Sequence, residues 1–171
     1  MSRRGRGLSE RLDAVSSAVG RAASWLTLLM VLLTLLIVVL RYAFDSGQIW
    51  LQELLTWMHA LVFMLGAAYT LQLDGHVRVD VFYRDMSERQ RAWVNALGVL
   101  LFVFPLCGYF VYESLPYIGR SFGNHEISRD AGGLPYPAIP VLKSVLLVMP
   151  LAVALQGLAL LLNAVGVLRR R

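Results

Sequence analysis

Three histidines and one cysteine are the side chains of this sequence best suited to hold a metal or a haem. His59 lies inside a charge-free stretch, whereas His76 and His125 lie in charged segments. A haem carried within a helix bundle needs axial ligands that face each other, so His59 would have to share the iron with a methionine. Cys107 stands alone and can form neither an intrachain disulfide nor a thiolate cluster. We therefore expect no catalytic residue, no metal site and no cofactor in this chain, and a haem-binding membrane subunit is one alternative.

Carboxylates that could couple transport to an ion gradient do not occur in the middle of the charge-free stretches. Ion-coupled carriers place a carboxylate near the middle of the membrane, where a charge costs about 2.5–3.5 kcal/mol and is kept for function. Glu53 and Glu113 lie at the ends of their stretches. His59 lies roughly 9 Å of helix rise from Glu53, and we interpret it as a hydrogen-bonded packing residue. The chain is not expected to transport by itself, and a self-sufficient small four-helix exporter or channel is the second alternative.

Four stretches without a charged residue define the elements that must position these side chains. An apolar helix needs roughly 20 residues to cross the hydrocarbon core of a bilayer. The sequence therefore predicts an all-α membrane protein, a single domain over 1–171, with transmembrane helices at 22–40, 54–73, 92–112 and 144–168. A polar register upstream predicts an N-terminal cytoplasmic or interfacial extension of the first helix over 8–21. Pro105 and Pro150 fall inside helices and should kink them, because proline removes a backbone donor and clashes with the preceding turn.

Local signals predict where two of these helices begin. Ser87 and Gln90 fit a capping box, so the third helix should start well before Ala92. Pro140 suits the first turn of the fourth helix. The segment between the third and fourth stretches, 113–143, holds four of the six prolines and is expected to be a turn-rich connector.

Basic residues are distributed unevenly around the four stretches. Twelve of the 16 lysine and arginine residues fall in the N-terminal tail, in the segment between the second and third stretches, or at the C-terminus. Loops rich in Lys and Arg stay on the cytoplasmic side. Both termini are therefore predicted to be cytoplasmic. The net charge of +5 indicates contact with anionic membrane lipid and not with nucleic acid.

Small and weakly polar residues recur at steps of three and four along the stretches. Membrane helices use such stripes to approach each other, because lipid leaves no hydrophobic drive for their association. We expect the stripes to be packing faces. In the first helix the stripe contains Glu10, Asp13, Ser17, Gly20, Ser24, Thr27, Val31, Thr34, Val38 and Arg41. In the second it contains Gln52, Thr56, His59, Phe63, Gly66 and Thr70. In the fourth it contains Met149, Ala152, Gln156, Ala159, Asn163 and Gly166.

Three charged residues come to the predicted outer surface at helix ends. Arg41 ends the first helix, Glu53 begins the second, and Lys143 begins the fourth. The partly dry interface strengthens Coulomb attraction relative to water. We predict that Glu53 is ionised and pairs with Lys143, with Arg41 as the other candidate, and that the pair serves assembly. Trp50 at the same level suits an aromatic anchor.

Several motifs carry a family resemblance when they are taken in order. The sequence WLQE at 50–53 opens the second helix, and GAAY at 66–69 with DGHVRVD at 74–80 closes it. SRDAGGLP at 128–135 and Lys143 follow before the last helix. From Arg21 onward the chain resembles the small membrane subunit, of the DctQ type, of the tripartite ATP-independent periplasmic (TRAP) transporters. The DGHVRVD segment is the most specific element.

The resemblance implies a role in the bacterial cell inner membrane. In such systems a periplasmic binding protein captures an organic acid and docks on a membrane pair, and the large membrane subunit carries the sodium and substrate sites. This chain would then be the accessory permease subunit, with no cofactor of its own. Fourteen residues are candidates for structural or subunit-interface roles: Arg41, Trp50, Gln52, Glu53, His59, Gly66, Tyr69, His76, Arg78, Asp80, Gly133, Pro135, Lys143 and Gln156.

Overall fold

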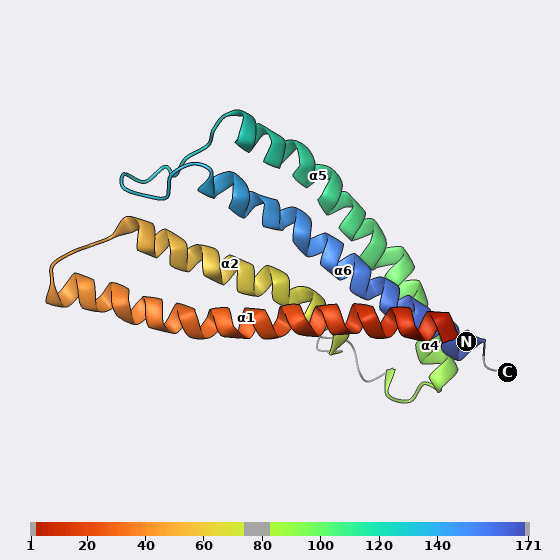
Figure 1. Cartoon of the computed structure of the whole chain (residues 1–171). Helices are drawn as coiled ribbons and strands as arrows, with labels where there is room; N and C mark the ends of the chain where they lie inside the picture. Colours follow the sequence, from red (N-terminus) through yellow and green to blue (C-terminus); the bar gives the residue numbers. More distant parts are fainter. Residues whose placement is uncertain (1–2, 74–82, 170–171) are drawn as a thin grey trace.

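The computed structural model describes residues 3–73 and 83–169, and every regular element in these two ranges is helical (Figure 1). Four segments are long and apolar enough to cross a membrane, which confirms the predicted number of spans and the all-helical class. The elements are α1 (Arg3–Ala43), α2 (Ile49–Gln72), α4 (Glu88–Gly98), the π-helical turn η1 (Val99–Val103), α5 (Phe104–Gly123) and α6 (Ala138–Leu168).

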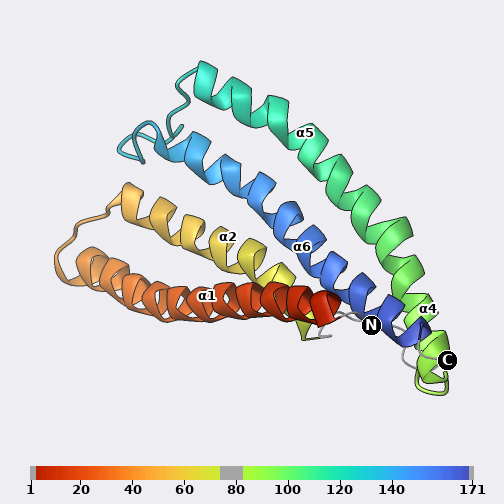
Figure 2. The same ribbon diagram turned by 45° about the vertical axis from the view of Figure 1, so that its right-hand side comes forward.

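The helices form a fan. In both views α2 and α6 lie between α1 and α5, and the helices converge toward the end that holds both chain termini (Figures 1 and 2). We call this the terminal end. The opposite end, with the turn at 44–48 and the connection at 124–137, is the loop end. α6 is the central helix because it contacts α1, α2, α4 and α5.

The first helix continues without a break from Arg3 to Ala43, so segment 8–21 and the first apolar stretch form one rod. Gly20 is buried where α1 crosses α2, and a Cβ atom there would lie 2.7 Å from Cδ2 of Tyr69 and closer still to Cγ. Glycine at this position therefore lets the Tyr69 ring lie directly on the α1 backbone. The predicted stripe and the packing face coincide at this crossing.

Beyond Gly20 the predicted packing stripe of α1 is wrong. Ser24 and Thr27 are exposed, and their hydroxyls donate to the carbonyls of Gly20 at 3.1 Å and Ala23 at 3.2 Å, one turn back. A hydroxyl satisfied by its own helix needs no neighbour. Larger apolar side chains are instead partly buried on this half of α1: Leu26, Met30, Leu33, Ile37 and Leu40.

The third span begins as predicted and ends later than predicted. Ser87 and Gln90 form a reciprocal capping box at the start of α4. Pro105 has no N–H, and in the turn before it the Phe104 N–H bonds to the carbonyl of Val99, five residues back. α5 then runs through Pro116 to Gly123, so the first part of the expected turn-rich connector is helical. The kinks at Pro105 and Pro150 stay predictions.

Small residues let α6 pack closely on its neighbours. Ala159, Ala164 and Gly166 are buried along the helix, and Ala164 forms a cluster with Ala92 and Ala96 of α4. A Cβ atom on Gly157 would lie 3.2 Å from Cγ1 of Val103. Close backbone approach is what stabilises helix pairs in lipid. Pro140 lies in the first turn of α6, as predicted.

The contact at Gly20 predicts the effect of one added methyl group. Gly20→Ala should lower the free energy of unfolding by about 1–3 kcal/mol, because the methyl group displaces the base of the Tyr69 ring. Gly108→Ala on α5 is the matched control, since nothing lies within 4 Å of its Cβ position. Thermal unfolding in detergent should show a lower midpoint for Gly20→Ala alone. Equal midpoints for the two variants would contradict the close contact.

Candidate functional site

Glu53 anchors the loop at the loop end of the molecule. Its Oε2 accepts a hydrogen bond from the backbone N–H of Leu134 at 2.6 Å, and its Oε1 accepts one from the hydroxyl of Ser128. The Ser128 hydroxyl in turn accepts from the N–H of Asp130 at 3.1 Å. Hydrogen bonds to an ionised carboxylate are about twice as strong as neutral ones. One side chain of α2 thus holds both arms of a loop that lies 75 to 81 residues further along the chain.

Gly133 makes room for this anchor. A Cβ atom at Gly133 would lie 2.7 Å from Oε1 of Glu53 and closer to the Ser128 hydroxyl. The Gly133 N–H donates to the carbonyl of Asp130 at 3.0 Å, which closes the turn. A larger residue at 133 would push the loop away from the Glu53 carboxylate. Gly133, a candidate from the SRDAGGLP motif, therefore lies in direct contact with the Glu53 anchor.

Lys143 belongs to a second network on the same loop. Its Nζ forms an ion pair with Glu126 and lies 4.2 Å from the centroid of the Tyr117 ring. The Ser121 hydroxyl also donates to Oε2 of Glu126, at 2.6 Å. The hydrogen bonds from Lys143 and then from Ser121 lower the pKa of Glu126 below its ordinary value. This network ties the end of α5 and the loop to the start of α6.

The predicted ion pair between Glu53 and Lys143 is therefore wrong. α5 extends to Gly123, and the short connection that follows brings Glu126 to Lys143. Glu53 instead accepts hydrogen bonds from two neutral donors of the loop, the Ser128 hydroxyl and the Leu134 N–H. Both residues do fix the loop to a helix, Glu53 to α2 and Lys143 to α6.

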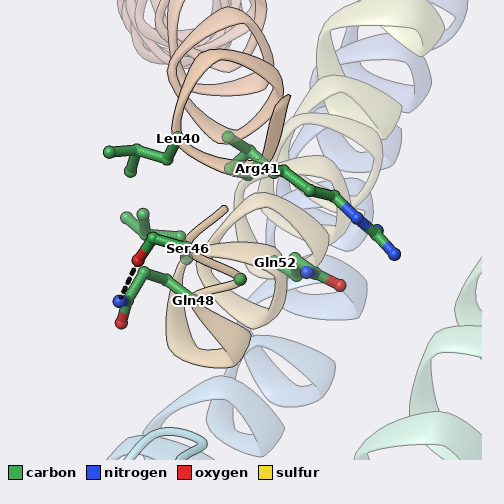
Figure 3. Close-up of a pocket in the computed structure, with 8 residues that line it drawn as sticks. Leu40, Arg41, Ser46, Gln48 and Gln52 are labelled. Carbon is green, nitrogen blue, oxygen red and sulfur yellow. Dashed lines mark hydrogen bonds between the residues drawn. The ribbon is translucent and has the colours of Figure 1, made fainter. Parts of the chain in front are cut away.

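Arg41 and Gln52 lie together beside the turn between α1 and α2. Figure 3 shows both side chains extending to the same side, while Leu40 points away from them. Gln48 donates to the Ser46 hydroxyl at 3.0 Å and accepts from the Trp50 indole at 3.2 Å. Trp50 thus has a satisfied polar edge and an exposed ring. Arg41 has no acidic partner among the described residues.

A polar network joins three helices nearer the terminal end. Gln156 of α6 is 1% exposed; it accepts from the Ser16 hydroxyl at 2.6 Å and donates to Oδ1 of Asp13 at 2.8 Å. Gln72 of α2 donates to the Asp13 carbonyl at 2.9 Å and accepts from Ser17 at 3.1 Å. Polar groups buried in this way need partners within the protein. The network fixes α1 against both α2 and α6.

Comparison with protein families shows which family this chain belongs to. Residues 30–170 match the family model described as tripartite ATP-independent periplasmic transporters, DctQ component. The chain belongs to this family. No curated protein and no solved structure matches it.

The DctQ match covers three candidate residues that lie outside the described part of the chain: His76, Arg78 and Asp80. Of the others, Tyr69 packs on Gly20, and Pro135 is exposed with its carbonyl accepting from the Ala138 N–H at 2.9 Å. His59 is exposed on α2, and its role as a hydrogen-bonded packing residue stays a prediction. Gly66 has nothing within 4 Å of its Cβ position and takes no part in a close contact.

Six residues that make these contacts are outside the fourteen candidates, although Asp13 is part of the predicted stripe and Ser128 part of the SRDAGGLP motif: Asp13, Ser16, Gln72, Ser121, Glu126 and Ser128. Gln72 carried a signal, because a glutamine inside a charge-free stretch needs a partner. Among the residues described, no group of three or more His, Cys, Asp or Glu side chains is placed to hold a metal. The contacts observed are structural anchors.

Hydrogen exchange at the Leu134 amide tests the Glu53 anchor of this DctQ component. Glu53→Ala should lower the hydrogen-exchange protection of the Leu134 amide by about tenfold or more, because a bond to a charged acceptor contributes about 1.5–3 kcal/mol. Glu53→Gln keeps one acceptor and should have a smaller effect. Glu113→Ala is the control, since Glu113 is exposed on α5. Unchanged protection in Glu53→Ala would show that the loop holds its shape without the carboxylate.

Proposed function

We propose that this chain is the small accessory permease subunit of a TRAP-type transporter that takes up an organic acid with a sodium gradient. Its partners are a large membrane subunit and a periplasmic binding protein, and its site of action is the bacterial inner membrane. The observation that carries the proposal is the DctQ family match over residues 30–170. The four helices able to span a membrane support it.

The hydrogen bonds that Glu53 accepts support an accessory role for this chain and not a role in ion coupling. Both of its carboxylate oxygens accept hydrogen bonds from Ser128 and Leu134. Hard cations are held by oxygen ligands, carboxylates among them, so an ion at Glu53 would have to compete with these two donors. A carboxylate engaged in holding a loop is a poor ligand for an ion that must be bound and released in each cycle. We assign the sodium sites to the large subunit.

The anchored loop supports contact with the binding protein. Glu53 and Lys143 fix the loop at its two sides, while Ile127, Arg129 and Asp130 are exposed between them. A docking surface gains affinity when its loop is ordered before the partner arrives. We therefore place the loop end in the periplasm, which puts both chain termini in the cytoplasm.

This orientation predicts the outcome of a reporter experiment. Both termini lie at one end of the molecule (Figures 1 and 2), so a reporter fused after the last residue should be active only in the cytoplasm. A reporter inserted beside the exposed Arg129 should be active only in the periplasm. A C-terminal fusion that reports the periplasm would reverse the orientation.

Reconstitution tests the function itself. The isolated chain in liposomes should take up none of a panel of labelled carboxylates, because it lacks the transporting subunit. Addition of the large subunit, the binding protein and an inward sodium gradient should produce uptake, and collapse of the gradient should abolish it. Uptake by the isolated chain would instead favour a self-sufficient channel or exporter.

A further inference from the structure

One face of α2 is polar and is left uncovered by the rest of the chain. Five of its residues are exposed and recur at helical steps, so they form a single stripe along the helix. We call this the α2 stripe: Gln52, Thr56, His59, Phe63 and Thr70. The sequence predicts a packing face here, but the five side chains stay exposed although α1 and α6 both contact α2. The face is therefore free for something outside this chain.

The polar groups of the α2 stripe are incompletely satisfied. Thr56 and Thr70 donate to the carbonyls of Gln52 and Gly66, each at 3.0 Å, and so bond within their own helix. The His59 ring and the Gln52 amide have no hydrogen-bond partner in ranges 3–73 and 83–169. His59 lies close to the middle of a 24-residue span. Hydrocarbon offers such groups no hydrogen bond, so contact with lipid alone is unfavourable there.

The exposed face of α1 has a different character. It is dominated by large aliphatic side chains suited to contact with acyl chains: Leu28, Leu29, Leu32, Leu35, Leu36 and Val39. Its exposed Thr34 donates to the carbonyl of Met30 at 2.7 Å and is satisfied within the helix. The two neighbouring helices thus present unlike surfaces. The apolar one suits lipid, and the polar one suits another membrane helix.

A positive charge lies at the loop end of the α2 stripe. The Arg41 side chain extends beside Gln52, which begins the stripe (Figure 3). The described part of the chain provides no acidic group for it. A cation at the partly dry membrane interface attracts an anion more strongly than it does in bulk water. The surface therefore runs from an unpaired guanidinium to a histidine near the middle of the span.

We propose that the α2 stripe and Arg41 are covered by a membrane helix of the large subunit. That helix carries a carboxylate opposite Arg41 and a hydrogen-bonding side chain opposite His59. Gly66 and the two threonines permit close approach, which is how helices associate in lipid. This inference rests on the proposed function, since it names the surface through which the accessory subunit binds its partner.

Photocrosslinking in the assembled complex tests the surface. Phe63, in the α2 stripe, and Phe102, in η1, are matched because they are 77% and 73% exposed and both lie near the middle of a span. Each is replaced in turn by p-benzoylphenylalanine, and the chain is co-expressed with the large subunit. Position 63 should crosslink to the large subunit. Position 102 should crosslink to lipid and not to the large subunit.

The possible outcomes distinguish a failure of this inference from a failure of the proposed function. If the wild-type chain does not co-purify with the large subunit, both fail. If the complex forms but position 102 crosslinks to the large subunit in place of position 63, the function stands and the α2 surface is wrong. Crosslinks from position 63 to lipid alone, or to a second copy of this chain, also overturn the surface.

Charge reversal tests the predicted carboxylate. Arg41→Glu should weaken the association of the two subunits about tenfold or more, whereas Arg41→Lys should retain most of it. Neither change removes a hydrogen bond or ion pair within the described chain, so the thermal midpoint of the isolated subunit should be unchanged. An Arg41→Glu variant that binds the large subunit as tightly as the wild type would exclude the charge pair.

Discussion

The arrangement of the helices depends on the hydrogen bonds made by the buried Gln156 side chain. It is almost fully buried in α6 and bonds to both Ser16 and Asp13 of α1, while Asp13 also receives a bond from Gln72 of α2. Buried polar groups such as the Gln156 amide and the Ser16 hydroxyl need partners within the protein, so a change of register would leave them unpaired. The three helices therefore meet in one register, and Gly20 provides the close approach beside it.

The loop end is also held together by polar side chains. The helices spread apart there (Figure 1), and side-chain bonds take the place of close backbone packing. Glu53 holds the 124–137 connection to α2 through Ser128 and Leu134. The ion pair between Lys143 and Glu126 holds the beginning of the same connection to α6. A wide but ordered surface results. Such a surface suits the proposed docking of a periplasmic binding protein.

The uncovered faces of the helices separate into two kinds. α1 presents aliphatic side chains that need only lipid, whereas α2 presents His59, Gln52 and the neighbouring Arg41 without partners in the described chain. A fan in which α6 alone contacts most of the other helices leaves much surface exposed. This openness agrees with the proposed binding of a large membrane subunit.

The sequence by itself determined the number of spans, the capping box at Ser87 and the family, because hydropathy, helical period and short motifs are properties of contiguous residues. Only the tertiary structure decided which partners Glu53, Lys143 and Gln156 take. Those of Glu53 and Gln156 lie 75 to 143 residues away, and the partner of Lys143 depends on where α5 ends. A periodic stripe likewise shows that a helix has a polar face. It does not show which polar side chains bond to their own helix, as Thr56 and Thr70 do, and which are left exposed, as His59 is, because that depends on where the neighbouring helices lie.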